Sequence, residues 1–475
     1  MLFVRLDLHI CVSMALKGII IRGDAPDQLE SGVAHQLQLL LGVAPGYYRV
    51  QDQTIVPAEG FTRTVEQTEG LFFQLTPPAD PLSGNISVLF LQGEDLAPFF
   101  RTGRFTTAML ESPAYTIQIG FRSDSVTEDL GECRLRLLPY AANKTKDLLI
   151  REISLLAAKI IGELNNHQRK SVHPLPFLTQ EKPLRVKSSW RHKLEQLFTT
   201  YKWNIGIIDL PIREIATGKG PFTVRWIQEA PGNDFKADPF GFNDGTNDIL
   251  LFEYYHSRQR KGVIHLLDKT GERELLKNEN HLSYPFVFEH QGKQIVMPES
   301  ADDKRTAMYS FHEGKLVNHQ FLFENEQVVD PTVFYFENRW WLFCTKKANQ
   351  GADLRLYIFY SASPEGPWIS HQSNPVKTDI CTARPGGTPF LLDGKLIRPA
   401  QNSSKGYGAA LMLMEITLLT PDDFQEQVFR QLQPHDFSGP YHEGIHTLSA
   451  WGNKTLVDGK RIRYTLQPFL RQFVK

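Results

Sequence analysis

The chain has 475 residues, more than one hydrophobic core usually supports, so we expect two domains or one large domain with an accessory one. Its 52 Lys and Arg residues balance 53 Asp and Glu residues, which excludes an overall field that would favour nucleic acid or an anionic membrane. Four widely spaced cysteines without a CxxC pair argue against a zinc site or a disulfide framework, and no metal or other cofactor is predicted.

The beginning of the chain makes a poor signal peptide. Its apolar run carries Asp7 and His9 and lacks a small-residue cleavage site. No apolar stretch approaches the roughly 20 residues of a transmembrane helix. We therefore expect a cytoplasmic protein without a transmembrane segment.

Residues 1–165 have the pattern of an α/β domain. A short strand is predicted at residues 18–22, followed by an amphipathic helix and then by strands at residues 86–93 and 115–122. A long amphipathic helix is predicted at residues 146–164. The apolar face of the first helix is formed by leucines and a valine: Leu29, Val33, Leu37, Leu40 and Leu41.

Residues 166–200 are basic and contain proline, which is typical of a linker. One short helix is expected in it after Ser188. The domain boundary is therefore placed here, between residues 1–165 and 201–475.

Residues 201–475 consist of short β-rich runs separated by Gly, Asn and Asp turns. An X-Pro pair recurs four times at intervals of 46, 46 and 54 residues, which is the spacing of propeller blades. A fifth copy of the strand-turn-strand pattern has Thr447 in place of proline. We therefore predict an all-β five-bladed β-propeller. The four pairs are Asp238-Pro239, Tyr284-Pro285, Asp330-Pro331 and Arg384-Pro385.

Each proline is expected at the first residue of an innermost strand, because proline cannot donate a ladder hydrogen bond. The preceding residue would then point at the propeller axis. The isolated strand WNIGIIDLPI is expected to close the ring by pairing with the last blade. The aromatic side chains that follow the anchors are expected to pack between blades: Phe240, Phe286, Phe334, Trp340, Trp341 and Phe390.

The residues predicted to face the axis carry the chemistry of a sugar site. Carboxylates beside a small cavity can supply the base and the acid that glycosyl transfer requires. Asp238 is the candidate general base, Glu299 the candidate acid and Asp330 the orienting carboxylate. The expected substrate-binding residues are Tyr284, Arg384, Glu443 and His446.

Two alternatives concern these assignments. Arg384 would bind an anionic group of the ligand or pair with Asp330. Asp238 and Asp330 would instead be structural if they only cap turns at strand starts, as Asp does readily.

The motifs KADPF, SYPFV, MPES, DPT, NRWWLF, GPW, ARPGG and GIHTLS, between residues 203 and 459, resemble the N-terminal propeller domain of glucosamine inositolphosphorylceramide transferases and their bacterial relatives. That domain is similar to five-bladed glycoside hydrolases of the arabinanase and levansucrase type. The resemblance implies an aspartate base, a second aspartate and a glutamate acid around the axis, and Asp238 matches the first. Glu299 precedes Asp330, whereas in those hydrolases the glutamate comes later.

The same resemblance bears on the N-terminal domain. Bacterial relatives carry a formyltransferase-like domain there, and residues 1–165 are weakly similar to it in layout. No Asn, His and Asp constellation for formyl transfer is evident, so a degenerate scaffold or partner-binding domain is expected.

Three functions follow from these observations. The first is glycosyl transfer in glycan or surface-polysaccharide biosynthesis, with an activated or lipid-linked sugar as the substrate. The second is glycoside hydrolysis, which the missing export signal disfavours. The third is glycan binding without turnover, for which three acids are not needed.

Overall fold

The computed structural model divides the chain into two compact units, one holding most residues up to Lys187 and the other Ser188–Lys475 together with the short segments Arg134–Arg136 and Pro176–Gln180. The structure describes residues 16–20, 26, 28–41, 46–51, 54–57, 69–74, 85–92, 96–102, 104–112, 114–122, 127–165, 175, 190, 197–347 and 354–465.

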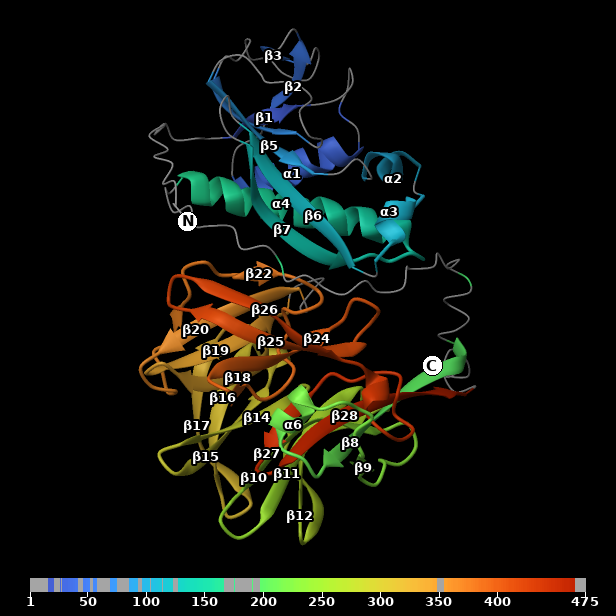
Figure 1. Ribbon diagram of the computed structural model, residues 1–475, viewed down its shortest axis with the longest axis vertical. Helices are drawn as coiled ribbons and strands as arrows, with labels where there is room; N and C mark the ends of the chain where they lie inside the picture. Colours follow the sequence, from blue (N-terminus) through green and yellow to red (C-terminus); the bar gives the residue numbers. More distant parts are fainter. Residues whose placement is uncertain are drawn as a thin grey trace. The chain divides into compact units, whose positions relative to one another are not determined.

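The first unit contains a seven-stranded sheet in the order β3-β2-β1-β4-β5-β6-β7 (Figure 1). β1 pairs in parallel with β2 and β4, and β4 pairs in parallel with β5, whereas β5 and β6 are antiparallel. Three of its strands confirm the predicted ones, with shifted ends. The strands are β1 Leu16–Ile20, β2 Gly46–Gln51, β3 Thr54–Pro57, β4 Glu69–Gln74, β5 Asn85–Leu91, β6 Ala114–Arg122 and β7 Thr127–Arg136.

Two long helices of this unit pack against each other. Helix α1, Gln28–Leu41, approaches α4, Ala142–Asn165, so closely that a Cβ on Gly32 would lie 2.6 Å from Ile150. The predicted apolar face of α1 is wrong at Leu40, which is 44% exposed. Between them in sequence lie the short helices α2 Leu96–Thr102 and α3 Thr107–Leu110.

The predicted linker falls largely outside the described residues, and so does its short helix. Of residues 166–200, the structure describes only 175, 190 and 197–200. The boundary predicted there stays a prediction.

The described residues of the second unit form five small antiparallel sheets. Four of them are formed by consecutive strands: β10 Phe235–Asn243 to β13 Gly271–Leu276, β14 Ser283–His290 to β17 Lys315–Glu324, β18 Val328–Phe336 to β22 Lys377–Thr378, and β23 Phe390–Leu392 to β26 Phe424–Leu432. The strands that lie between these in sequence are β11 Asp248–His256, β12 Lys261–Asp268, β15 Lys293–Glu299, β16 Arg305–His312, β19 Arg339–Lys346, β20 Arg355–Ser361, β21 Ile369–Ser370, β24 Lys395–Asn402 and β25 Ala410–Leu419.

The fifth sheet joins the two ends of this unit. Its order is β27-β28-β8-β9, and β8 pairs with β28 from Ile208–Thr455 to Thr199–Tyr464. Figure 1 shows the green strand β8 beside the red strand β28. The prediction that WNIGIIDLPI pairs with the last sheet is therefore confirmed. The strands are β8 Thr199–Ile208, β9 Arg225–Trp226, β27 Leu448–Trp451 and β28 Lys454–Tyr464.

Each sheet contacts the next. β10 contacts β14, β14 contacts β18, and β10 also contacts β27, so that the fifth sheet lies against the first. Apolar side chains of the third and fourth sheets share one cluster, and Gly387 bridges to Leu448 of the fifth. The aromatic residues predicted as packing core all belong to such clusters. The remaining helical turns are α6 Ile212–Thr217, η1 Ala301–Asp303 and η2 Pro434–Asp436.

The prediction that each proline opens an innermost strand is wrong. Pro239, Pro285 and Pro331 lie inside β10, β14 and β18, and the strand pairing shifts register at each of them. A β-bulge leaves an unpaired residue, so it accommodates a proline within a strand. In the fourth sheet, Pro385 makes only an isolated bridge with Ala400, and β23 begins later.

No helix among the described residues is long and apolar enough to span a membrane.

Candidate functional site

The bulges give three anchor residues an unusual backbone conformation. Asp238, Tyr284 and Asp330 have φ values of 52°, 43° and 48°. Non-glycine residues with positive φ are uncommon and often mark functional or strained positions. The same conformation at the same point of three successive sheets shows that the anchors are structurally equivalent.

Two further acids come from the neighbouring strands. Glu253 on β11 pairs with Ala237, and Glu299 on β15 pairs with Ser283, so each lies opposite the residue before an anchor. All the acids of this group are buried. We call the carboxylate cluster the set of Asp238, Glu253, Glu299, Asp330 and Asp458.

Carboxylates of this cluster bind the anchors' backbone N–H groups across sheet boundaries. Asp238 N–H donates to Asp458 Oδ2 over 3.2 Å, and Tyr284 N–H donates to Asp238 Oδ2 over 3.3 Å. Asp330 N–H donates to Glu299 Oε2 over 3.2 Å. The bulges withdraw these donors from the ladders, and buried donors need partners. The acids therefore hold adjacent sheets together.

His446 lies between two of the carboxylates. Its Nε2 is 2.9 Å from Asp238 Oδ1, and its Nδ1 is 3.1 Å from Asp458 Oδ2. Burial favours the neutral ring, but the charges of Asp458 and Asp238 outweigh it and raise the pKa of His446 to about 10. The ring is therefore an imidazolium at neutral pH.

The environments of the acids push their pKa values apart. Burial would raise the pKa of Asp238, but His446 and the Thr447 hydroxyl, which donates over 2.9 Å, lower it below its usual value. Burial, followed by the charge of Asp238, raises the pKa of Glu253 well above its usual value. Burial and the charge of Asp330 do the same for Glu299. The cluster therefore combines one carboxyl group whose pKa is lowered, Asp238, with two whose pKa values are raised, Glu253 and Glu299.

Asp330 is held by two side chains from the fourth sheet. Arg384 donates through Nε to Asp330 Oδ2, which also accepts a 2.8 Å hydrogen bond from Gln401 Nε2. Of the two alternatives for Arg384, the structure thus shows the pairing with Asp330.

Tyr284 has a structural role in addition to its anchor position. Its hydroxyl accepts from Gly387 N–H over 2.8 Å and lies 2.9 Å from Thr332 Oγ1. It thereby joins the second, third and fourth sheets.

An aromatic surface borders the cluster. Tyr407 is 41% exposed, its ring centroid lies 4.9 Å from that of His446, and the Arg384 guanidinium lies 5.1 Å from it. Trp203 packs edge-on against His446 with centroids 4.3 Å apart. Lys460 lies 5.2 Å from the Trp203 ring, which places a cation on the same border.

The structure brings together six of the seven residues predicted from the sequence. Glu443 is exposed, and its side chain lies 3.8 Å from His442, outside the cluster. The six that meet are Asp238, Tyr284, Glu299, Asp330, Arg384 and His446.

Sequence reasoning missed Glu253, although the repeat contains a signal for it. Glu253 follows Asp238 at the interval at which Glu299 follows Tyr284 and Thr345 follows Asp330. Asp458 and Tyr407 were also missed, and they have no such signal because the last two copies differ in length.

One set of residues could hold a cation. Asp238, His446 and Asp458 present ligand atoms that lie within 4.8 Å of one another. Occupancy would require a neutral imidazole, which the pKa of about 10 disfavours. His446 Nδ1 lacks a hydrogen bond of good geometry in spite of its short distance to Asp458.

Solved structures similar to this chain include glycoside hydrolases. A thermostable family-43 glycoside hydrolase is 11% identical, with 43% of this chain and 78% of that chain covered and a TM-score of 0.32. The α-L-arabinofuranosidase PaAbf62A from Podospora anserina is 11% identical, with coverages of 52% and 86% and a TM-score of 0.36.

Curated relatives are more similar in sequence. Glucosamine inositolphosphorylceramide transferase 1 of Oryza sativa subsp. japonica is 32% identical over 206 residues, which are 41% of this chain and 28% of the relative. The protein of the same name from Arabidopsis thaliana is 31% identical over 256 residues, 48% of this chain and 33% of the relative. The chain thus spans a third or less of the relatives it matches.

The family match covers most of the region that contains the cluster. It extends over residues 223–437 and includes Asp238, Glu253, Glu299, Asp330 and Arg384. The resemblance predicted from the sequence is thereby confirmed for residues 223–437, which match the family described as glucosamine inositolphosphorylceramide transferase 1, N-terminal.

Proposed function

We propose that the second unit is a five-bladed β-propeller whose axial carboxylate cluster transfers a glycosyl group in cytoplasmic glycan or surface-polysaccharide biosynthesis. Five buried carboxyl groups from four sheets carry this proposal, and four of them, Asp238, Glu299, Asp330 and Asp458, accept hydrogen bonds across sheet boundaries. Buried charges are costly, and such clusters are more frequent at functional sites than in structural cores.

The acid and base assignments follow from the environments of the carboxyl groups. Asp238 stays ionised at neutral pH because His446 pairs with it, so it can accept the proton of an acceptor hydroxyl. Glu253 and Glu299 have raised pKa values and can donate a proton to a leaving oxygen. The two glutamates are therefore alternative acids, of which the sequence suggested only the second.

The border of the cluster supports a sugar ligand. Tyr407 offers an exposed ring next to the Arg384 guanidinium, and the Lys460 ammonium lies near Trp203. Aromatic faces with a few fixed polar groups are typical of small-molecule sites. The cations would accommodate the phosphate of an activated or lipid-linked sugar.

A transfer assay with purified protein tests this proposal. Nucleotide sugars and polyprenyl-phosphate sugars are supplied with a panel of glycan acceptors, and mass spectrometry follows both the transferred and the free sugar. D238N, E253Q and E299Q are compared with E313Q, which alters an exposed turn glutamate. We expect turnover to fall at least about 100-fold in D238N and in one glutamate variant, and to be unchanged in E313Q.

Two results decide against transfer. Equal turnover in all four variants would remove the cluster from the chemistry. Release of free sugar at the same rate with and without acceptor would identify hydrolysis as the reaction.

Glycan binding without turnover is the second candidate, and one observation favours it. Asp238, Glu299 and Asp458 each accept a backbone N–H from an adjacent sheet, so part of the cluster is accounted for by structure. In this case saturable glycan binding would be found without transferred or released sugar.

A further inference from the structure

The second sheet carries a cavity that is separate from the carboxylate cluster. Its volume is about 470 Å³, within the range of about 300–1,000 Å³ that is usual for small-molecule sites. The loops before β14 and after β15 form it together with β16 and β17. We call it the β15–β16 cavity; its lining residues that matter here are Asn278, Asn280, Asp303, Arg305, Tyr309 and Phe321.

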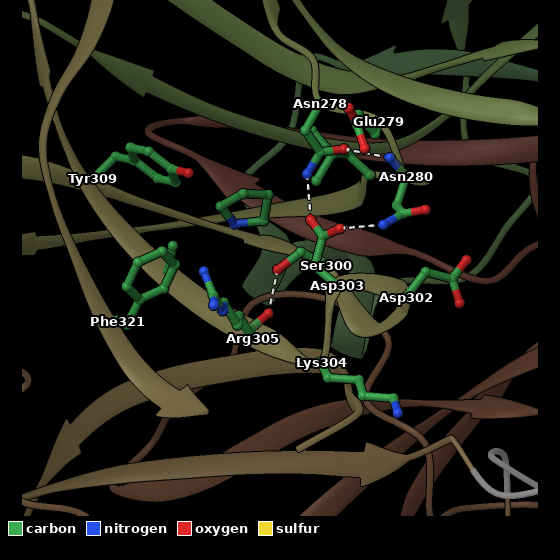
Figure 2. A pocket seen from close by; sticks show the side chains of 13 residues that line it. Asn278, Glu279, Asn280, Ser300, Asp302, Asp303, Lys304, Arg305, Tyr309 and Phe321 are labelled. Carbon is green, nitrogen blue, oxygen red and sulfur yellow. Dashed lines mark hydrogen bonds between the residues drawn. The ribbon is translucent and has the colours of Figure 1, made fainter. Parts of the chain in front are cut away.

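One side of the cavity is a fixed polar group. Asp303 accepts hydrogen bonds from the side-chain amides of Asn278 and Asn280, the latter over 2.5 Å. These bonds fix the orientation of both amides. Asn278 Oδ1 also accepts from Asn280 N–H over 3.0 Å, so the second N–H of each amide and the Asn280 amide oxygen are the groups that a ligand could bind. Figure 2 shows the three side chains converging.

The opposite side of the cavity is aromatic. Phe321 is 39% exposed, and the Arg305 guanidinium lies 5.2 Å from its ring. Figure 2 shows Tyr309 and Phe321 together, facing Asp303 and its amide partners across the cavity. An apolar face opposite hydrogen-bonding groups suits a ring that has one apolar face and several hydroxyls.

The charges around the cavity balance. Three acids line it, Glu279, Asp302 and Asp303, against Lys304 and Arg305, and Lys347 pairs with Asp302. The cavity therefore offers no excess of positive charge that would select a phosphate or carboxylate group.

The strand β15 connects the cavity to the cluster. Pro298 and Ser300 line the cavity, whereas Glu299 between them binds Asp330 N–H. Alternate residues of a strand face opposite sides. The strand end that presents the candidate acid on one side therefore forms a cavity wall on the other.

We propose that the β15–β16 cavity binds a neutral hexopyranose unit, as a carbohydrate subsite distinct from the carboxylate cluster. This inference rests on the proposed carbohydrate function. The subsite would hold a second sugar of an extended glycan while the cluster acts on the first.

Binding of methyl β-D-glucopyranoside, methyl β-D-galactopyranoside and methyl α-D-mannopyranoside to the full chain tests the inference by saturation-transfer NMR and calorimetry. F321A removes the aromatic face, and D303A removes the group that orients the amides. Y335A is the matched control, because Tyr335 is an exposed aromatic residue, 56% accessible, that does not line the cavity. E299Q reports on the cluster.

We expect at least one glycoside to bind, about tenfold more weakly in F321A and D303A, and within twofold of wild type in Y335A and E299Q. Glucose 1-phosphate should bind no more tightly than the neutral glycosides. If D303A does not fold, the binding measured for F321A tests the inference, because the Phe321 side chain is exposed and its removal should not prevent folding.

Three results would overturn the inference: no binding by any glycoside, equal binding in F321A and wild type, or loss of binding in E299Q alone. The last would assign the sugar to the cluster. If the protein transfers sugar but no glycoside binds in the cavity, the subsite is rejected while the proposed function stands.

Discussion

The stability of the carboxylate cluster depends on the charge of one residue, His446, which lies between Asp238 and Asp458. The pKa of His446 is raised to about 10 in the folded protein, against an ordinary value near 6.5. Below about pH 6.5 the His446 ring is charged in both the folded and the unfolded chain, so its ion pairs with Asp238 and Asp458 stabilise the folded state in full. As pH rises through 10 the folded protein also loses the proton, and the stabilisation disappears.

Replacing His446 with Gln should destabilise the second unit by about 3–5 kcal/mol at pH 6, because two buried carboxylates lose their counter-ion. The difference between variant and wild type should shrink as pH rises from 6.5 toward 10. Urea unfolding at a series of pH values measures it. H442Q is the control, since His442 is exposed. A difference that grows with pH would contradict the assigned charge.

At the scale of single residues, the sequence pointed to the anchor residues but only to some of the acids on the neighbouring strands. The X-Pro repeat marks Asp238, Tyr284 and Asp330 because a proline within a strand leaves a visible signal. Glu253 carries no local mark, and only the repeat offset identifies it. Glu443 was predicted from its closeness to His446 in sequence, but the turn between them leaves it in solvent.

At the scale of elements, the contacts between sheets depend on a few backbone positions. The sequence predicted the repeated strand-turn-strand pattern of the second unit, yet it could not predict the bulges, because a bulge depends on the pairing of two strands. The positive φ of the anchor Tyr284 therefore could not be predicted from the residue pattern. The sequence also could not predict the late start of β23, before which Gly387 makes an isolated bridge with Leu448 of the fifth sheet.

Gly387 provides a test of this contact. Its φ is 133°, and a Cβ there would lie 1.8 Å from the Leu448 carbonyl oxygen. We expect G387A to lose more than about 3 kcal/mol of stability, because alanine is strained at this φ and its Cβ would also clash with the Leu448 carbonyl. In G394A, where φ is 80° and nothing lies within 4 Å of the added carbon, only the cost of about 1–2 kcal/mol for a left-handed alanine should appear. Thermal unfolding compares the two, and equal losses would show that Leu448 moves aside.

At the scale of the whole molecule, the second unit is organised by pairing its first strand with its last. This could be predicted because WNIGIIDLPI is an isolated strand that precedes the first repeat. The α/β pattern of the first unit was also readable from the periodicity of α4 and the β-rich runs. Its role was not, because no pattern of reactive residues marks it, and a degenerate formyltransferase-like scaffold or partner-binding domain stays a prediction.

Removal of β28 tests the closing pair. A chain ending at residue 453 should lose its cooperative unfolding transition, because β8 then loses β28 along the ten residues of their register and keeps only the short strand β9 as a neighbour. A chain ending at residue 465 keeps the pair and serves as the control. Circular dichroism during heating distinguishes them, and a transition of equal midpoint in both would show that the fifth sheet is dispensable.

The same pairing has a consequence for biosynthesis. Ile208 pairs with Thr455, so a ribosome that adds about 5–20 residues per second exposes β8 for roughly 10–50 s before its partner emerges. During this interval the nascent chain presents an open strand edge with Ile205 and Ile207 uncovered. We expect chaperones that shield nascent chains to bind at this edge. The chain would be released from them for good only after β28 has been synthesised and pairs with β8.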